Sequence, residues 1–366
     1  MDESVDYYEV EPDLAVPTGE YVEEWLEDHE MTQAELARRT GVSRKHISTV
    51  ISGAPVSTEF ATKLELVTGV PAERWLALEA TYRSELARLG LEEKYALRSD
   101  ILDLFGPSLT YLREREVIKG NRRKPGQLIL QLMAYFQVAD PDALLAPRNH
   151  FALAFRQSAA IQVNEASVST WLRTAELHRL HEPLNTPFDR DGLQELLPSL
   201  RSLSRELQSD PGAWIRALAG VGVHVIPLAE VKGCRAYGAT YWSGGQPILV
   251  LSARGKNDGA LWFTLFHELG HVLLHANEGF VEQRDGVEAV DVREEEANRF
   301  AEDALVPARY RPELNQLKSK HDVKVFAMKI GVSPGVVLQH LHYHDYPRWP
   351  HQNGTDLFIK VQIGED

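Results

Sequence analysis

The run Phe266-His267-Glu268-Leu269-Gly270-His271 constrains the fold more than any other feature of the sequence. Side chains four positions apart lie on one face of a helix, so His267 and His271 would project together, about one turn apart. Residues 261–274 are mostly apolar and include no proline, which predicts a helix here. Such a helix can present two imidazoles to one metal ion and hold Glu268 beside a water molecule.

The rest of the site is expected in an acidic segment that begins 23 positions after His271 (294 − 271 = 23). Glu294 is followed one helical turn later by Asn298, a pattern typical of the third ligand of a gluzincin-type zinc site and of the residue that orients a ligand. Glu295 and Glu296 leave the register open, because a shift of one or two positions would exchange the third ligand.

We predict one Zn²⁺ per chain in this centre. The predicted set comprises the metal ligands His267, His271 and Glu294, the catalytic general base Glu268 and the supporting residue Asn298. Zinc with three protein ligands keeps an open position for water, whose proton the glutamate would accept as the water attacks a carbonyl. Candidates for a further donor to the developing oxyanion are Tyr237, Tyr241 and His224.

Other histidines carry weaker signals. His275 lies one turn beyond His271, where a solvated helix histidine is expected more than a residue that supports the site. His340, His342 and His344 stand close together near the end of the chain. They suggest another metal site, but it is disfavoured because no cysteine or acidic ligand is expected nearby.

The charge and cysteine content exclude several classes of protein. Among 366 residues, 53 are acidic and 39 are basic, so the net charge of −14 disfavours a protein that coats nucleic acid. Any DNA contact must come from a local basic patch. Cys234 is the only cysteine, which excludes an intrachain disulfide and favours a reducing compartment. The acidic N-terminus has no apolar signal segment and no membrane span is evident, so a cytoplasmic location is expected.

The predicted fold class is α+β, mainly α, with three structured parts between two terminal tails. Short β-like runs at 221–226 and 248–251 precede the helix with the histidines. The expected division is an acidic tail (1–19), a helix-turn-helix domain (20–90), a helical coupling region (91–208), a zincin-like α+β metallopeptidase domain (209–345) and an irregular C-terminal tail (346–366).

The N-terminal part has the pattern of a helix-turn-helix. Thr32 and Glu35 form a capping box for a short helix over 33–40, and Gly41 makes the turn. Ser43 caps a second helix that runs to Ile51. Two short helices joined in this way place the second one in the major groove of DNA.

Predicted DNA contacts cluster at the start of these helices. They are Gln33 on a phosphate, and Ser43, Arg44, Lys45 and Thr49 at the start and along the outer face of the second helix. Residues 20–90 nevertheless contain eight Lys/Arg against twelve Asp/Glu, so binding should require a dimer. The alternative is an interaction module that has lost DNA binding.

The same segment resembles the XRE-type helix-turn-helix of HigA-like antitoxins over residues 31–89. The resemblance is carried by residues 31–37 (MTQAELA), 41–45 (GVSRK), 51–53 (ISG) and 70–78 (VPAERWLAL). It implies a transcriptional regulator that binds operator DNA, in the setting of a toxin–antitoxin or stress response.

Residues 233–343 resemble the ImmA/IrrE family of bacterial metallopeptidases. The markers are residues 238–242 (GATYW), 261–271 (LWFTLFHELGH) and 294–307, which end in Leu305-Val306-Pro307. By position, the resemblance implies that His267, His271 and Glu294 bind zinc and that Glu268 is the general base of a hydrolase.

Together these features predict a DNA-binding regulator with a zinc metallopeptidase domain that cleaves itself or a partner repressor in response to a signal. One alternative is a non-proteolytic antitoxin or repressor, whose metal-binding domain senses a ligand or binds a toxin. Another is a peptidase whose helix-turn-helix recruits protein rather than DNA.

Overall fold

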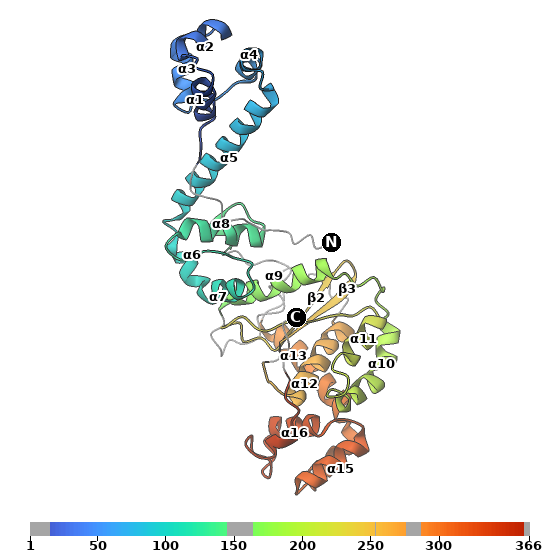
Figure 1. The fold of residues 1–366 in the computed structure, drawn as a ribbon. Helices are drawn as coiled ribbons and strands as arrows, with labels where there is room; N and C mark the ends of the chain where they lie inside the picture. The colour runs from blue at the N-terminus through green and yellow to red at the C-terminus, as the bar shows by residue number, and fades with distance from the viewer. Residues whose placement is uncertain (1–14, 145–163, 253, 276–286, 362–366) are drawn as a thin grey trace. The chain divides into compact units, whose positions relative to one another are not determined.

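The computed structural model describes residues 15–144, 164–252, 254–275 and 287–361, with the backbone alone described at 287–291. Two compact units are present. The first contains residues up to Asp103 together with Leu112–Leu144, and the second contains Leu104–Tyr111 and the residues after Leu144. Helices dominate both, and a single three-stranded sheet lies in the second, so the predicted fold class is confirmed (Figure 1).

The first unit is helical throughout its described part. Its elements are α1 (Thr18–Asp28), α2 (Gln33–Thr40), α3 (Arg44–Ile51), α4 (Thr58–Thr68), α5 (Ala72–Tyr95), α6 (Ser99–Leu104), α8 (Pro125–Phe136) and η1 (Pro141–Leu144), while α7 (Gly106–Glu114) belongs partly to each unit. Helices α1 to α4 and the start of α5 enclose a core built around Leu36, Ile47 and Leu64, none of which is exposed.

The predicted helix-turn-helix forms with the expected bounds. The Thr32 hydroxyl accepts a hydrogen bond from the Glu35 N–H at 3.2 Å, and the Ser43 hydroxyl accepts one from the His46 N–H at 3.1 Å. Gly41 ends α2 in the left-handed region, with φ of 69°. One detail of the prediction is wrong, because the Glu35 carboxylate does not return to Thr32. It pairs instead with Arg38 and Arg39, one turn further along the helix.

The second unit is built on a sheet with helices on both faces (Figure 1). Its elements are α9 (Glu165–His181), α10 (Arg190–Ser202), η2 (Leu203–Arg205), α11 (Ala213–Gly220), β1 (His224–Pro227), β2 (Gly238–Ser243), β3 (Gln246–Leu251), α12 (Asp258–Leu274), α13 (Val287–Leu305), η3 (Ala308–Tyr310), α14 (Arg311–Leu314), α15 (Lys320–Ile330), α16 (Pro334–Tyr343) and η4 (Thr355–Leu357). No helix in the described residues is long and apolar enough to cross a membrane.

The sheet has the strand order β1-β3-β2, with β1 parallel and β2 antiparallel to β3. Strands β1 and β3 overlap the predicted runs at 221–226 and 248–251, whereas β2 was not predicted as a strand. His224, Ile248 and Tyr241 lie in one row across the sheet. Since side chains alternate along a strand, Thr240 and Gly238 of β2 point to the face opposite Tyr241, which is the face that α12 covers.

Helix α12 is the centre of the second unit. It contacts α13, α16 and the strands β2 and β3, and its Trp262 and Phe266 are fully buried. At its first residue, the buried carboxylate of Asp258 accepts hydrogen bonds from the Ser333 hydroxyl at 2.5 Å and from the Ile359 N–H at 2.9 Å. The irregular segment after α16 therefore packs on this core, where Trp349 and Leu357 are also buried.

Helices α15 and α16 repeat the turn of α2 and α3. Gly331-Val332-Ser333 stands where the first motif has Gly41-Val42-Ser43, and Gly331 has a φ of 78°. The valine N–H donates to the carbonyl of Ala327 at 3.0 Å, as Val42 does to Ala37 at 3.1 Å. Ser333 caps α16 as Ser43 caps α3. We call α2–α3 the first motif and α15–α16 the second motif. The second motif was not predicted from the sequence.

Candidate metal centre

Two helices bring the predicted ligands together. Asn257 caps α12 by accepting a hydrogen bond from the Ala260 N–H at 2.8 Å, and the helix then carries His267 and His271 on one face. Helix α13 packs along it at Gly270, where an added Cβ would lie only 3.1 Å from Cα of Ala297. This close approach places Glu294 opposite the two histidines.

The three ligand atoms form a small triangle. Nε2 of His267 lies 3.1 Å from Nε2 of His271, and the carboxylate of Glu294 lies 3.3 Å and 3.1 Å from these two nitrogens. Among the described His, Cys, Asp and Glu residues, these form the only set of three whose ligand atoms all lie within 4.8 Å of one another. Of the glutamates between which the sequence left the register open, Glu294 faces the two histidines and Glu295 is exposed, so Glu294 stays the predicted third ligand.

The distances and donor types fit a zinc ion. Zinc bonds of about 2.0–2.2 Å in a tetrahedral arrangement separate neighbouring ligand atoms by about 3.3–3.6 Å, slightly more than the distances found here. Oε1 of Glu294 is buried and, among the described residues, makes no well-oriented hydrogen bond, although Nε2 of His271 lies 3.1 Å away. Atoms that approach closely without hydrogen-bond geometry are expected where both point to a common third position.

The protonation of His267 supports the same conclusion. Oδ1 of Asn298 lies 2.9 Å from Nδ1 of His267, and an amide oxygen only accepts hydrogen bonds. Nδ1 therefore carries the proton in the neutral ring, and the lone pair of Nε2 points toward His271 and Glu294. Asn298 thus contacts a predicted ligand, as its predicted supporting role requires.

The electrostatics of the site favour a positive charge between these groups. Burial lowers the pKa of His267, but the contact with Glu294 and the charge of Glu268 outweigh it and leave that pKa above its ordinary value. Burial raises the pKa of Glu294, but its close contacts with His267 and His271 outweigh burial and hold that pKa at about 2. A metal cation supplies the charge that these groups otherwise take from a proton.

Glu268 lies beside the ligands and is held by the sheet. Its carboxylate accepts a hydrogen bond from the Thr240 hydroxyl at 2.6 Å, and only 6% of the residue is exposed. A Cβ on Gly238 would lie 2.6 Å from Oε1 of Glu268, so only glycine leaves room for this carboxylate. Thr240 and Gly238 belong to a segment that carries the family resemblance, but their contact with Glu268 was not predicted from the sequence.

His275 also belongs to the centre. Its Nδ1 lies 3.0 Å from Nδ1 of His271, and its Nε2 lies 3.1 Å from Oε2 of Glu296. Its side chain is 11% exposed. The expectation of a solvated helix histidine is therefore wrong, and the spacing of one turn from His271 was the signal that could have indicated this contact.

Two of the candidate oxyanion donors lie elsewhere. Tyr241 and His224 share the sheet face opposite Glu268, beside Arg179 of α9. Burial raises the pKa of Tyr241 to about 12, and burial together with nearby cations lowers the pKa of His224. Tyr237 is half exposed, and its ring lies beneath the guanidinium of Arg254 at 5.5 Å.

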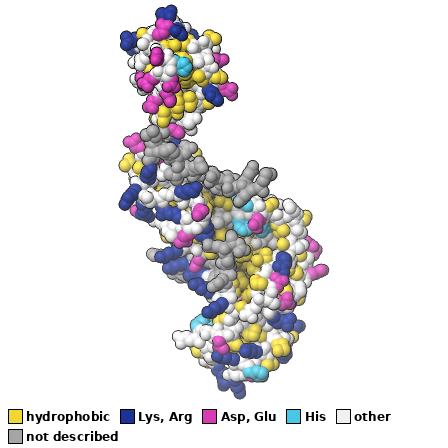
Figure 2. Space-filling model, in the orientation of Figure 1, with side chains coloured by type: hydrophobic (Ala, Val, Ile, Leu, Met, Phe, Trp, Pro, Cys, Tyr) yellow, Lys and Arg dark blue, Asp and Glu magenta, His cyan; other side chains and the backbone are white. Residues whose placement is uncertain are grey.

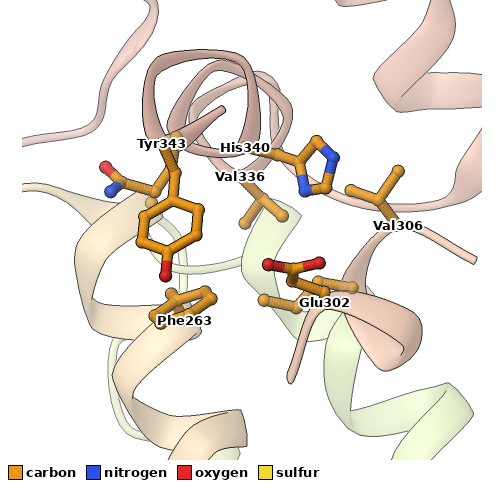
Figure 3. A pocket seen from close by; sticks show the side chains of 9 residues that line it. Phe263, Glu302, Val306, Val336, His340 and Tyr343 are labelled. Atoms are coloured by element: carbon orange, nitrogen blue, oxygen red, sulfur yellow. The ribbon is translucent and has the colours of Figure 1, made fainter. Parts of the chain in front are cut away.

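A small pocket lies along α12, one turn before His267. Figure 3 shows it between Phe263, Glu302, His340 and Tyr343. The space admits little more than one water molecule, with about 10 Å³ for its centre. Glu302 supplies an acidic partner for His344, at 3.2 Å, that the sequence had not indicated.

His340, His342 and His344 do not form a second metal site with the other described residues. Arg311 lies 3.8 Å from the other oxygen of Glu302, and no third ligand atom joins the pair of Glu302 and His344 within the separation found at the first centre. Nε2 of His342 points away, 3.1 Å from the carbonyl oxygen of Asn353.

The predicted DNA contacts lie on the exposed side of the first motif. Ser43, Arg44, Lys45 and Thr49 are exposed, and Gln33 is partly buried at the start of α2. Thr49 donates its hydroxyl hydrogen to the carbonyl of His46 at 2.8 Å. In the described residues neither Arg44 nor Lys45 forms an ion pair, whereas Arg38 and Arg39 are occupied by Glu35. Figure 2 shows acidic and basic side chains mixed on the surface of this module.

Comparison with known families finds one match in the N-terminal part of the chain and one in the C-terminal part. Residues 219–342 match the family model of the IrrE N-terminal-like domain, a peptidase family, and residues 22–75 match a model of the helix-turn-helix. No curated protein and no solved structure shows significant similarity to the chain. The chain thus carries an XRE-type helix-turn-helix domain at its N-terminus and an IrrE/ImmA-like peptidase-family domain at its C-terminus.

Proposed function

We propose that this chain is a DNA-binding transcriptional regulator whose C-terminal domain is a zinc-dependent metallopeptidase. Its substrate would be an exposed segment of its own chain or of a partner repressor, cut in response to a signal. The observation that carries the proposal is the position of Glu268. A structural metal site requires only ligands, whereas here a buried carboxylate that is not a ligand stands beside them, fixed by the Thr240 hydroxyl at 2.6 Å.

The residues divide the chemistry among them. His267, His271 and Glu294 would hold Zn²⁺, which when bound polarises a peptide carbonyl and eases the deprotonation of water. Glu268 accepts the proton of the attacking water and delivers it to the leaving amine nitrogen. Thr240 keeps one carboxylate oxygen occupied, so the other remains for proton transfer.

The N-terminal module would direct this activity to a specific DNA site. Arg44 and Lys45 project from the start of the exposed helix, where such helices contact base edges. The module contains twelve acidic and eight basic residues, so one copy attracts DNA weakly and a dimer on an inverted repeat supports stable binding. An operator near its own gene is the proposed target, as expected for a HigA-like regulator.

The test compares wild-type protein with Glu268→Gln after loading with zinc. We expect the variant to keep its zinc and its operator binding and to lose a cut that a chelator blocks in the wild type, because the substitution removes the base and no ligand. Cleavage is followed by mapping fragments by mass, with the chain alone and with candidate partner repressors. Glu295→Gln, an exposed neighbour of the ligand Glu294, should cut normally.

The opposite results are equally informative. Identical fragments from wild type and Glu268→Gln would contradict the peptidase assignment and favour the non-proteolytic antitoxin, in which the metal-binding domain senses a ligand or binds a toxin. Operator binding that is absent in the wild type would instead favour recruitment of protein by the helix-turn-helix.

A further inference from the structure

The two candidate histidine ligands are supported in different ways. His267 meets the amide oxygen of Asn298 directly, at 2.9 Å. His271 meets a second histidine, His275, which in turn meets the carboxylate of Glu296. Histidine ligands usually donate their second N–H to an acceptor that fixes the ring. At His271 that acceptor is itself a titratable ring with its own partner.

The contact between the two rings permits only certain protonation states. Nδ1 of His271 and Nδ1 of His275 lie 3.0 Å apart, so one of them must carry a hydrogen and the other a lone pair. A neutral imidazole has one N–H. If Nε2 of His271 is to bind a metal, the hydrogen of His271 must be on Nδ1, and His275 must accept it.

This requirement determines the state of His275 as well. Its Nδ1 is then the acceptor, so its hydrogen is on Nε2, which lies 3.1 Å from Oε2 of Glu296. Each group donates to the next in one direction, from His271 to His275 to Glu296. The carboxylate only accepts, so it favours this direction over the reverse.

We infer that His275 and Glu296 are positioning residues, which fix the ring and tautomer of His271 so that its Nε2 lone pair faces the metal. The inference rests on the proposed zinc site and adds to it two residues that do not bind the ion. It also gives separate roles to two of three consecutive glutamates, since Glu294 faces the ligand cluster while Glu296 faces the supporting histidine.

The exposure of the pair makes it suitable for substitution. The side chain of Glu296 is 53% exposed and that of His275 is 11% exposed, and neither is part of the apolar core of the unit. The neighbouring Glu295 is exposed and lies on the same helix, so Glu295→Ala removes an equal charge without touching His275. It is the matched control for Glu296→Ala.

The experiment measures the zinc dissociation constant of the full chain by competition with a chromogenic chelator. We expect His275→Ala and Glu296→Ala each to weaken zinc binding by about 10–100-fold, the usual effect of losing a partner of a ligand. Glu296→Gln should recover part of the loss, because its amide oxygen still accepts the N–H. Glu295→Ala should bind as the wild type does.

A double variant distinguishes the relay from two independent effects. If Glu296 acts through His275, the variant carrying both alanines binds zinc no more weakly than His275→Ala alone. The absorption bands of the Co²⁺-loaded protein should shift in both single variants, since they report ligand geometry, and the melting temperatures of the metal-free proteins should be equal.

The possible failures are separable. If the wild type binds no zinc, the proposed metal centre itself is wrong. If the wild type binds zinc and Glu296→Ala behaves like Glu295→Ala, the centre stands and the relay is wrong. An additive loss in the double variant also overturns the relay, because it shows that Glu296 acts without His275.

Discussion

The first and second motifs share the same turn, but the first exposes the helix that follows it and the second buries that helix. Gly41 and Gly331 both end the first helix in the left-handed region, and Ser43 and Ser333 both cap the second. In the first motif the second helix exposes Arg44, Lys45 and Thr49. In the second motif the corresponding helix is buried, and Gly335, Val336 and Val337 pack inside the unit that carries the candidate metal centre, where α16 contacts α12.

The difference shows that the shared turn fixes how the two helices are joined. The side chains on the outer face of the second helix then determine whether that helix is exposed for binding or packed into a core. Counting from the turn glycine, Lys45 corresponds to Gly335 and Val50 corresponds to His340. An exposed lysine suits contact with DNA, whereas a glycine permits another helix to approach. The second motif also lies almost wholly inside the residues that match the peptidase-family model, so its role is to complete that domain.

The largest effect is expected at the pair Lys45 and Gly335. An added Cβ on Gly335 would lie 2.2 Å from Oδ1 of Asp258, so Gly335→Ala should destabilise the second unit by about 2–3 kcal/mol through overpacking. Lys45→Ala should change stability by less than about 0.5 kcal/mol and weaken operator binding by about 1–3 kcal/mol. Urea unfolding and DNA titration measure the two effects. An equal loss of stability in Gly335→Ala and Lys45→Ala would contradict the proposed difference between the two motifs.

A smaller effect concerns the pair Val50 and His340 and depends on pH. Burial, with His344 and Arg311 nearby, lowers the pKa of His340 to about 3. The unfolded chain takes up a proton near pH 6.5 while the folded chain does not, so this group's contribution to stability is complete above pH 6.5 and is lost as the pH falls toward 3. Between pH 7 and pH 5 the loss is about 2 kcal/mol or less.

Urea midpoints at pH 7 and pH 5, with a chelator present, measure this loss. His340→Leu replaces the ring by an apolar side chain like the valine of the first motif, so its stability should depend less on pH. His321→Gln, at an exposed position, should keep the dependence of the wild type. A dependence that is unchanged in His340→Leu would show that His340 is protonated in the folded protein.

The smallest effects should be the same in both motifs. A Cβ on Gly41 or Gly331 meets no atom within 4 Å, so Gly41→Ala and Gly331→Ala introduce backbone strain without a clash. Each should destabilise its own unit by about 1–2 kcal/mol, the cost of a left-handed alanine. Thermal unfolding of the two variants tests this equality. A cost at Gly331 well above that at Gly41 would mean that the turns differ beyond their shared sequence.

The sequence predicted the parts of the molecule in which local spacing decides the structure. Helix caps at Thr32 and Ser43 and the pairing of His267 with His271 depend on residues three or four positions apart. The contacts that Thr240 makes with Glu268 and that His275 makes with Glu296 depend on packing between elements that are distant in the sequence. Thr240 reaches Glu268 only because β2 lies beside α12, and His275 meets Glu296 only because α13 returns along the same helix. Packing between elements distant in sequence gives no local signal.

The contact of α12 with α13 at Gly270 also bears on which ions the centre can accept. Two helices that touch through a bare backbone hold the ligand triangle at edges of 3.1–3.3 Å, which suits short bonds to a small ion. The two imidazole nitrogens of this triangle favour zinc over calcium, which prefers oxygen ligands. The missing side chain at Gly270 thus lets two helices from separate parts of the sequence bring one carboxylate within reach of both nitrogens, so the smallest residue on the helix sets the span of the whole ligand set.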